Sequence, residues 1–163
     1  MKEKIIIKEE DNIYFLDNSF WYEVIYMLDA GKIIIAGLGR SSDHVRASFL
    51  LHIRILNEFF YEHRDKNGNL QDKNDKKCPA WAIDYNGWKE KTKPSDIQEG
   101  IENLNIFLAH PSYHRNRSDL SNEFPVFLFY NHFKGLALKF LEEIDEKYLT
   151  KKLRELKELL KTN

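Results

Sequence analysis

The sequence predicts an all-α fold, an antiparallel bundle of four to five helices with a short N-terminal arm or hairpin. Residues 42–62 carry the longest apolar pattern at helical spacing, and this stripe is broad enough to contact several neighbouring helices. Its members are Val45, Phe49, Ile53, Leu56 and Phe60, widened by Leu51, Ile55 and Phe59. Several other segments share this spacing and are joined by short or medium connections, which is typical of an antiparallel bundle.

The bulk composition predicts one domain, residues 1–163, in the cytoplasm. A net charge of −1 lacks the basic excess that non-specific nucleic-acid binding needs. Cys78 is the only cysteine, so no intrachain disulfide forms and an intracellular location is the simpler expectation. The N-terminal apolar run is too short for a signal peptide, and no segment approaches the roughly 20 apolar residues of a membrane span. We therefore expect no membrane contact, no cofactor and no metal.

The N-terminal residues 1–17 contain two apolar runs around a polar turn, which predicts either a hairpin or an irregular arm. A helix over 18–37 follows, with Asn18 or Ser19 as its N-cap. The β-branched run 33–35 also fits a short buried strand. We favour a helix there, because the rest of the chain offers no obvious partner strands.

Residues 64–94 predict a long loop, because their first half is strongly polar and includes an Asn-Gly turn. Its second half is aromatic. We expect Trp81, Tyr85 and Trp88 to hold this part against the helices, with one helical turn around 80–85.

The second half of the chain predicts three more helical segments. Ser95 and Gln98 form a capping box that begins a helix, and Pro111 ends that helix near residue 110. Pro125 suits the first turn of the next helix, in which Gly135 offers a place for close helix contact. The leucine-rich tail, residues 148–161, either continues this helix or folds back after a break near residue 145.

His52 is the unusual residue of the central stripe, because it lies inside the apolar arc. The simpler interpretation is a core histidine whose ring nitrogens both find partners. The alternative is a buried acid/base, or an anchor for a site between helices.

Residues 103–117 give the strongest functional lead. Asn103 and His110 are seven apart and therefore lie on nearly the same side of the helix. His114, Arg115 and Arg117 follow at once. A histidine that moves a proton, beside guanidinium groups that hold phosphate, is what metal-independent phosphodiester cleavage requires. The alternatives are phosphate binding alone, or a histidine that caps the helix beside solvated arginines.

Residues 45–60 and 103–115 resemble a group of uncharacterised bacterial helical proteins, which in turn resemble the HEPN superfamily. The resemblance implies a helical bundle, often a homodimer. It also implies a role in toxin–antitoxin or defence systems, either as a metal-independent endoribonuclease or as a non-catalytic binding module. The motif of that superfamily is an arginine followed after four to six residues by a histidine, usually with a polar residue close behind the arginine. Here His110 matches the histidine and Asn105 the polar residue, whereas Asn103 stands where relatives carry the arginine.

The missing arginine favours a non-catalytic dimeric interaction module, because asparagine cannot supply positive charge to a phosphate. Its partner would be another protein, and the helix over 95–110 would lie near the dimer interface. The alternative function is a ribonuclease or an RNA- or nucleotide-binding protein with His110 as acid/base and Arg115 replacing the missing arginine. Asn103, Asn105, His114, Arg117 and His52 would then bind the substrate.

Overall fold

The computed structural model describes residues 9–37, 43–62, 81–109 and 125–162. Every regular element within these ranges is helical, which confirms the all-α prediction. The elements are α1 (Glu9–Phe15), the π-helical turn η1 (Leu16–Phe20), α2 (Trp21–Ile35), α3 (Asp43–Tyr61), the 3-10 turn η2 (Ala82–Asp84), α4 (Ser95–Ala109), α5 (Val126–Glu143), the 3-10 turn η5 (Glu146–Tyr148) and α6 (Lys151–Thr162).

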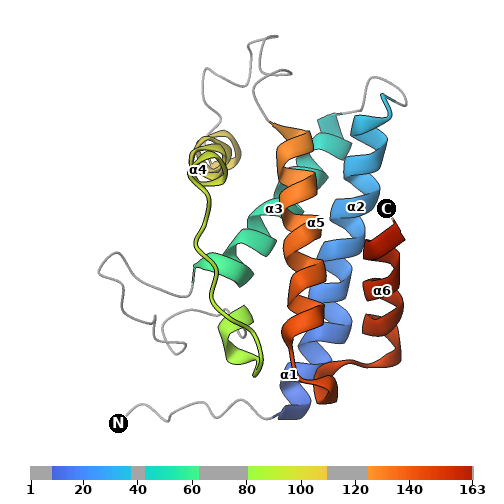
Figure 1. Cartoon of the computed structure of the whole chain (residues 1–163). Helices are drawn as coiled ribbons and strands as arrows, with labels where there is room; N and C mark the ends of the chain where they lie inside the picture. The colour runs from blue at the N-terminus through green and yellow to red at the C-terminus, as the bar shows by residue number, and fades with distance from the viewer. Residues whose placement is uncertain (1–8, 38–42, 63–80, 110–124, 163) are drawn as a thin grey trace.

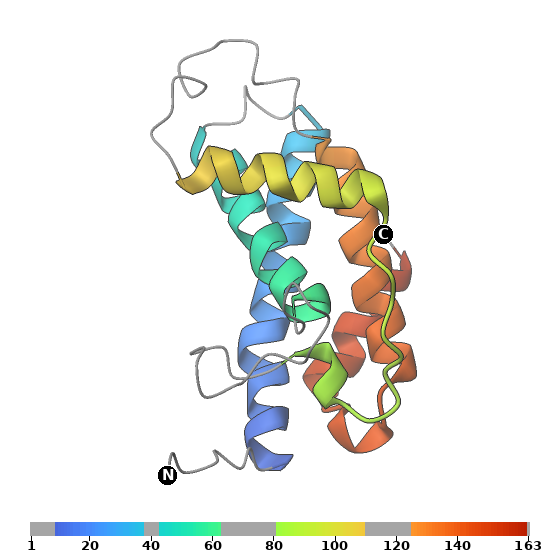
Figure 2. The ribbon, with the colours of Figure 1, turned by 90° about the vertical axis from the view of Figure 1, so that its left-hand side faces the viewer.

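The long helices pack as an antiparallel bundle that α4 crosses. Helix α3 runs back alongside α2, α5 runs antiparallel to α2, and α6 returns along α5 (Figure 1). Helix α4 lies almost perpendicular to the others, as the second view shows (Figure 2). Its buried side chains, Ile97, Ile101 and Leu104, are the inward stripe that helical spacing predicts.

The core confirms that α3 is central. Phe49, Ile53 and Leu56 of α3 are essentially inaccessible to solvent. An aromatic cluster surrounds Phe140 of α5, and its ring centroids lie 5.2–5.8 Å from that of Phe140. The members of this cluster are Phe20, Phe59, Phe60, Tyr85 and Trp88. Together with Phe140 they come from four separate parts of the chain, so their rings pack these parts together at one point.

The N-terminal prediction is wrong for residues 9–17. These residues are helical and run through η1 into α2, so neither a hairpin nor an irregular arm begins the described chain. Asn18 is not an N-cap, because its Nδ2 donates instead to the carbonyl oxygen of Tyr14, at 2.8 Å. The β-branched run 33–35 lies within α2, as favoured. Residues 1–8 lie outside the described residues.

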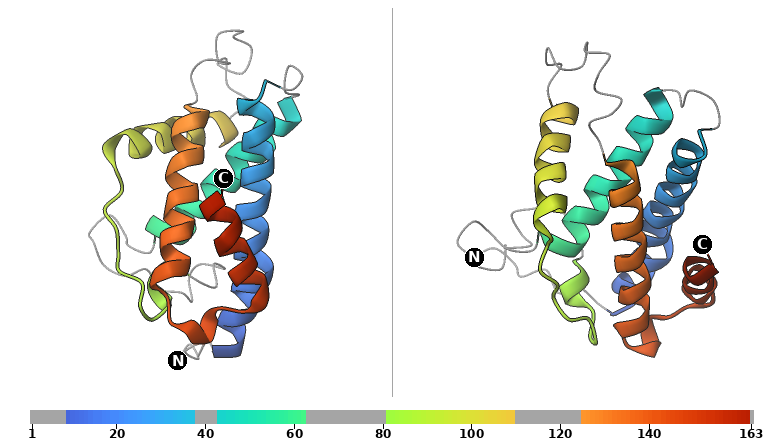
Figure 3. Two further views of the ribbon diagram at one scale, coloured as in Figure 1. Left: turned by 45° about the vertical axis from the view of Figure 1, so that its right-hand side comes forward. Right: turned by 45° about the horizontal axis from the view of Figure 1, so that its top comes forward.

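The C-terminal tail folds back rather than continuing α5, and η1 holds its beginning. The carbonyl oxygen of Asp17 accepts a hydrogen bond from Lys152 Nζ at 2.6 Å, and the Asp17 carboxylate accepts one from Thr150 Oγ1. A π-helical turn widens the helix and alters its backbone pairing. Here the turn coincides with the point at which α6 docks on the N-terminal helix. The left panel of Figure 3 shows α6 beside that helix.

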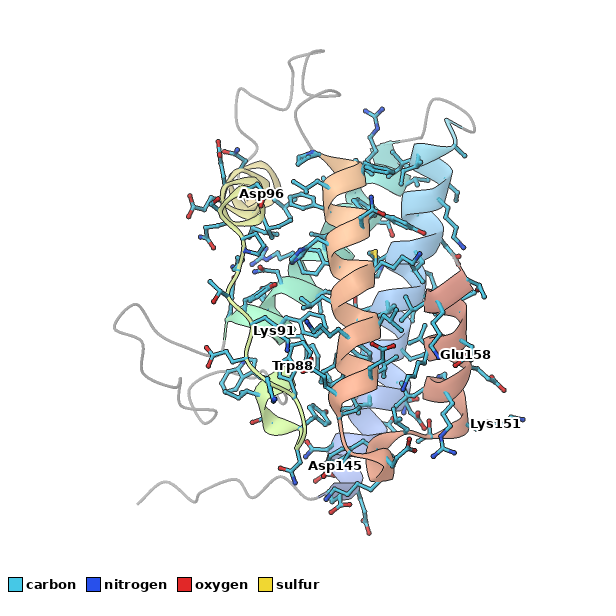
Figure 4. The ribbon with its side chains drawn as sticks, in the orientation of Figure 1. Trp88, Lys91, Asp96, Asp145, Lys151 and Glu158 are labelled. Carbon is cyan, nitrogen blue, oxygen red and sulfur yellow. The ribbon has the colours of Figure 1, made fainter. Side chains whose placement is uncertain are left out.

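The segment after residue 80 confirms its predicted aromatic packing. Trp81, Tyr85 and Trp88 are all buried, and η2 supplies the single predicted turn. Lys91 and Trp88 lie close together against the lower half of α5 (Figure 4), with Lys91 Nζ 4.8 Å from the Trp88 ring centroid. Lys91 Nζ also donates to both carboxylate oxygens of Glu143, at 2.8 and 2.9 Å. These contacts fix the approach to α4. Residues 63–80 of the predicted loop are outside the described part.

Burial alone would raise the pKa of the Glu143 carboxyl, but hydrogen bonds from the Lys91 ammonium and the Lys89 backbone N–H outweigh it. The pKa of Glu143 therefore lies below its usual value. The ionised Glu143 carboxylate therefore holds Lys89 and Lys91, in the segment before α4, against the end of α5.

Two local predictions about the second half are wrong. The Pro94 carbonyl oxygen accepts a hydrogen bond from the Gln98 N–H, so Pro94 is the N-cap of α4. The Gln98 side chain donates to Glu102 and forms no capping box. Gly135 faces open space; the close approaches are at Gly31, beneath Tyr130 and Phe49, and at Gly100, beneath Phe129.

A polar cluster lies where α3, α5 and the start of α4 meet. The Tyr61 hydroxyl and His132 Nε2 are hydrogen-bonded at 3.0 Å, and Lys93 Nζ lies 5.2 Å from the Tyr61 ring centroid. Burial raises the pKa of Tyr61 to about 12. Burial also lowers the pKa of His132, against an opposing effect of the Asp96 carboxylate. The same cause lowers the pKa of Lys93.

Because the pKa of His132 is lower in the folded chain, the unfolded chain binds a proton at this position more readily. Stability should therefore fall as pH drops below the unfolded value of about 6.5 and towards the folded value. His132→Gln keeps a hydrogen-bonding group beside Tyr61 but cannot titrate. We expect the wild type to lose more free energy of unfolding between pH 7.5 and 5.0 than this variant, in urea titrations. If the free energies of unfolding of the two proteins changed equally with pH, His132 would not contribute to the pH dependence of stability.

Candidate functional site

Most of the predicted phosphate site lies outside the described residues. This holds for His110, His114, Arg115 and Arg117, so their predicted roles stay predictions. Asn105 belongs to α4, but its side chain is likewise outside the described part. Asn103 is exposed on α4. Nothing in the described structure therefore brings the predicted catalytic residues together.

The described outer surface of α4 carries negative charge. Asp96, Glu99 and Glu102 are exposed there, together with Asn103. Such a surface repels phosphate groups, since three carboxylates stand where an RNA-binding helix needs cations. Two copies of α4 packed around a two-fold axis would also bring these like charges together. This helix is therefore a poor candidate for an RNA surface or a dimer contact over its described length.

His52 is buried between α3 and α2, where it pairs with Glu23. Only 5% of its surface is exposed, and its Nδ1 lies 2.5 Å from Glu23 Oε2. An ionised carboxylate can only accept hydrogen bonds, so Nδ1 is the donor and Glu23 fixes the ring orientation. Among the described residues no hydrogen bond uses Nε2, nor is this atom one of the buried unpaired ones. Among the described residues, His52 therefore has a hydrogen-bond partner at Nδ1 only.

Two tyrosines of α2 cover the His52 ring on its outer side. The ring centroids of Tyr22 and Tyr26 are 4.1 Å apart, and they lie 5.8 and 5.6 Å from that of His52. Burial raises the pKa of Tyr22, as do the nearby charges of Tyr26 and Glu23 and a hydrogen bond with Tyr26. The site is therefore an aromatic cluster with a carboxylate beside it.

Several apolar side chains of α2 and α3 are exposed. Tyr22 and Tyr26 are 42% and 45% exposed, and Leu51, next to His52, is 48% exposed. Leu51 was expected to widen the buried stripe of α3, and its exposure corrects that expectation. Ile33, 38% exposed, continues the stripe of Tyr22 and Tyr26 along α2 at helical spacing. We call these four residues the α2–α3 face; both helices are seen together in the right panel of Figure 3.

This arrangement suits contact better than catalysis. A histidine oriented by a carboxylate resembles the base of a nucleophilic site, but the described surroundings supply no hydroxyl or thiol nucleophile hydrogen-bonded to it. No group of three histidine, cysteine, aspartate or glutamate side chains in the described part is placed to hold a metal ion. Exposed aromatic and aliphatic side chains around a rigid buried pair are instead typical of protein-binding surfaces.

Sequence reasoning singled out His52 but missed its surroundings. The sequence alone does not pair His52 with Glu23, because the two residues lie 29 positions apart on different helices. Tyr22, Tyr26 and Ile33 were visible as a surface stripe at positions i, i+4 and i+11 of one helix. That spacing, on the side opposite the buried stripe, is the signal that would have found the face.

Among the described helices none combines the length and apolar character needed to cross a bilayer. Searches against protein-family models, curated proteins and solved structures found no match to this chain.

Proposed function

We propose that this protein is a non-catalytic, HEPN-like interaction module that works as a homodimer, and that the α2–α3 face is where the second copy docks. The observation that carries the proposal is the exposed stripe of Tyr22, Tyr26 and Ile33 on α2, whose two tyrosine rings lie against the buried His52 of the His52–Glu23 pair, with Leu51 exposed on α3. Aromatic side chains held rigidly at a surface are the usual anchors of protein contacts.

Two further features favour a second copy as the occupant. A symmetric dimer needs a patch that complements itself, and a mainly apolar stripe along α2 does so without requiring an opposite charge. The net charge of −1 also leaves little long-range repulsion between copies. The proposal moves the contact from α4, as the sequence suggested, to α2 and α3. Its direct test is whether substitutions of Tyr22 and Tyr26 turn a dimer into a monomer.

The alternative, a ribonuclease that uses His110 and Arg115, is tested by RNA cleavage. We expect wild type and His110→Ala to give equal background cleavage of single-stranded RNA in EDTA, because Asn103 supplies no positive charge to the phosphate. The positive control is Asn103→Arg, which restores the arginine at an exposed helical position. Cleavage by the wild type that His110→Ala abolishes would contradict the non-catalytic assignment.

A further inference from the structure

Lys93 is a half-buried lysine in the polar cluster where α3, α5 and the start of α4 meet. Its Nζ lies 5.2 Å from the Tyr61 ring centroid, within the range of a cation–π interaction. Among the described residues no carboxylate forms an ion pair with it, and no oxygen accepts a hydrogen bond from it. Three other lysines over aromatic rings each donate to an oxygen as well, namely Lys91 to Glu143, Lys147 to Glu9 and Lys152 to the Asp17 carbonyl.

The surroundings of Lys93 favour a neutral amine and still leave it accessible. Burial lowers the pKa of Lys93, although the Glu62 and Glu102 carboxylates oppose this effect. A lysine amine is a nucleophile in its neutral form, and partial burial is one of the ways in which proteins produce that form. Part of the side chain is in contact with solvent, so a small molecule can approach it.

The charges around Lys93 select the kind of molecule that can react there. Glu62 and Glu102 act on Lys93 itself, and Asp96 acts on the neighbouring His132. These carboxylates repel ligands that carry phosphate or carboxylate groups. They also disfavour acylation of Lys93, because acylation removes the positive charge that the carboxylates attract. A protonated Schiff base keeps that charge above the Tyr61 ring.

We propose that Lys93 is a covalent binding site for small uncharged aldehydes, which its amine captures as a Schiff base. The amine nitrogen adds to the carbonyl carbon, and one amine proton moves to the carbonyl oxygen. The second amine proton then leaves with that oxygen as water, so a C=N bond replaces the C=O bond without any oxidant or reductant. Solvent protonates the imine and restores the charge. The site uses none of the residues of the α2–α3 face and is independent of the proposed dimer.

The test is the initial rate at which each lysine of the full-length chain forms an imine with propanal. After a short incubation near neutral pH, sodium borohydride reduces each imine to a stable propylamine, and mass spectrometry of the peptides quantifies it. We expect Lys93 to react at least about threefold faster than Lys91, whose ammonium group pairs with the Glu143 carboxylate. As the pH rises, the rate at Lys93 should reach half of its plateau below the pH of about 10.4 that is usual for lysine.

Two variants of α4 separate the chemistry of the site from simple accessibility. Glu102 and Glu99 are both exposed on this helix, and of the two only Glu102 acts on Lys93. Glu102→Gln should raise the initial rate at Lys93 by about twofold, because it removes a charge that favours the ammonium form. Glu99→Gln should leave that rate unchanged. Circular dichroism of each variant checks that its helices are intact.

Glyoxylate, an aldehyde that carries a carboxylate, tests the preference for uncharged ligands. The ratio of labelling at Lys93 to labelling at Lys91 should be lower with glyoxylate than with propanal, because the carboxylates near Lys93 repel it. An equal or higher ratio would overturn this preference. The proposal as a whole is overturned if Lys93 reacts with propanal no faster than Lys91, or if Glu102→Gln and Glu99→Gln give the same rate at Lys93.

Discussion

Phe140→Ala is expected to lower the free energy of unfolding by about 3–5 kcal/mol, the usual loss when a buried phenylalanine is truncated. Phe140 is fully buried, and five aromatic rings from other parts of the chain contact it. Those rings belong to η1, α3 and the packed segment after residue 80, so they cannot close the cavity without moving one of these elements. Urea unfolding followed by circular dichroism measures the loss.

Phe127→Ala is the matched control for this prediction. Phe127 lies on the same helix, but 66% of its side chain is exposed, so its truncation should change stability by no more than about 0.5 kcal/mol. Because total stability of small domains is only about 5–15 kcal/mol, the two variants should differ visibly in urea midpoint. Equal midpoints would show that the aromatic cluster does not hold the bundle together.

The second large effect is expected at Gly87. Its φ is +92°, a conformation that other residues adopt only with strain, and an added Cβ would overlap the carbonyl oxygen of Glu143. That oxygen belongs to the backbone at the end of α5, where the Asp145 N–H also donates to the Asn86 carbonyl oxygen at 3.0 Å. Gly87→Ala should therefore cost about 2–4 kcal/mol and separate the Trp88 segment from α5.

Gly135→Ala is the internal comparison. Gly135 lies in the middle of α5 with nothing near its missing Cβ, so alanine there should stabilise the chain by about 0.5–1 kcal/mol through helix propensity alone. If Gly87→Ala lowers the free energy of unfolding and Gly135→Ala raises it, the steric clash at Gly87 is separated from the general gain in helix propensity on replacing glycine by alanine. If Gly87→Ala also stabilised the chain, the close approach at the end of α5 would be refuted.

The helices that the sequence predicted well have one dominant apolar stripe. Periodicity alone located α3, α4, α5 and α6, because the side chains of each at positions i, i+3 and i+4 are buried on one side. It failed at residues 9–17, where a short mixture of acidic and aromatic residues fits a strand or a helix equally. Ile13 and Phe15 pack against the core, and this packing favours the helix over the strand. Such long-range packing cannot be predicted from the local sequence.

The candidate site was predicted in part only, for a different reason. Helical spacing showed that His52 faces the core of α3, but its partner Glu23 is on another helix, and only the fold brings them together. Gly135 illustrates the same limit: a glycine in a helix signals close contact only if a neighbour passes there, and the neighbours pass at Gly31 and Gly100 instead.

Sedimentation equilibrium of the wild type and of Tyr22→Ser/Tyr26→Ser tests the account most directly. We predict a wild-type mass of twice the 19.5 kDa of the chain at micromolar concentration, and a monomer for the double variant with its helix content unchanged. Phe127→Ser, which removes an exposed ring from α5, should remain a dimer. A wild type that stays monomeric, or a double variant that still dimerises, would contradict the assignment of the α2–α3 face.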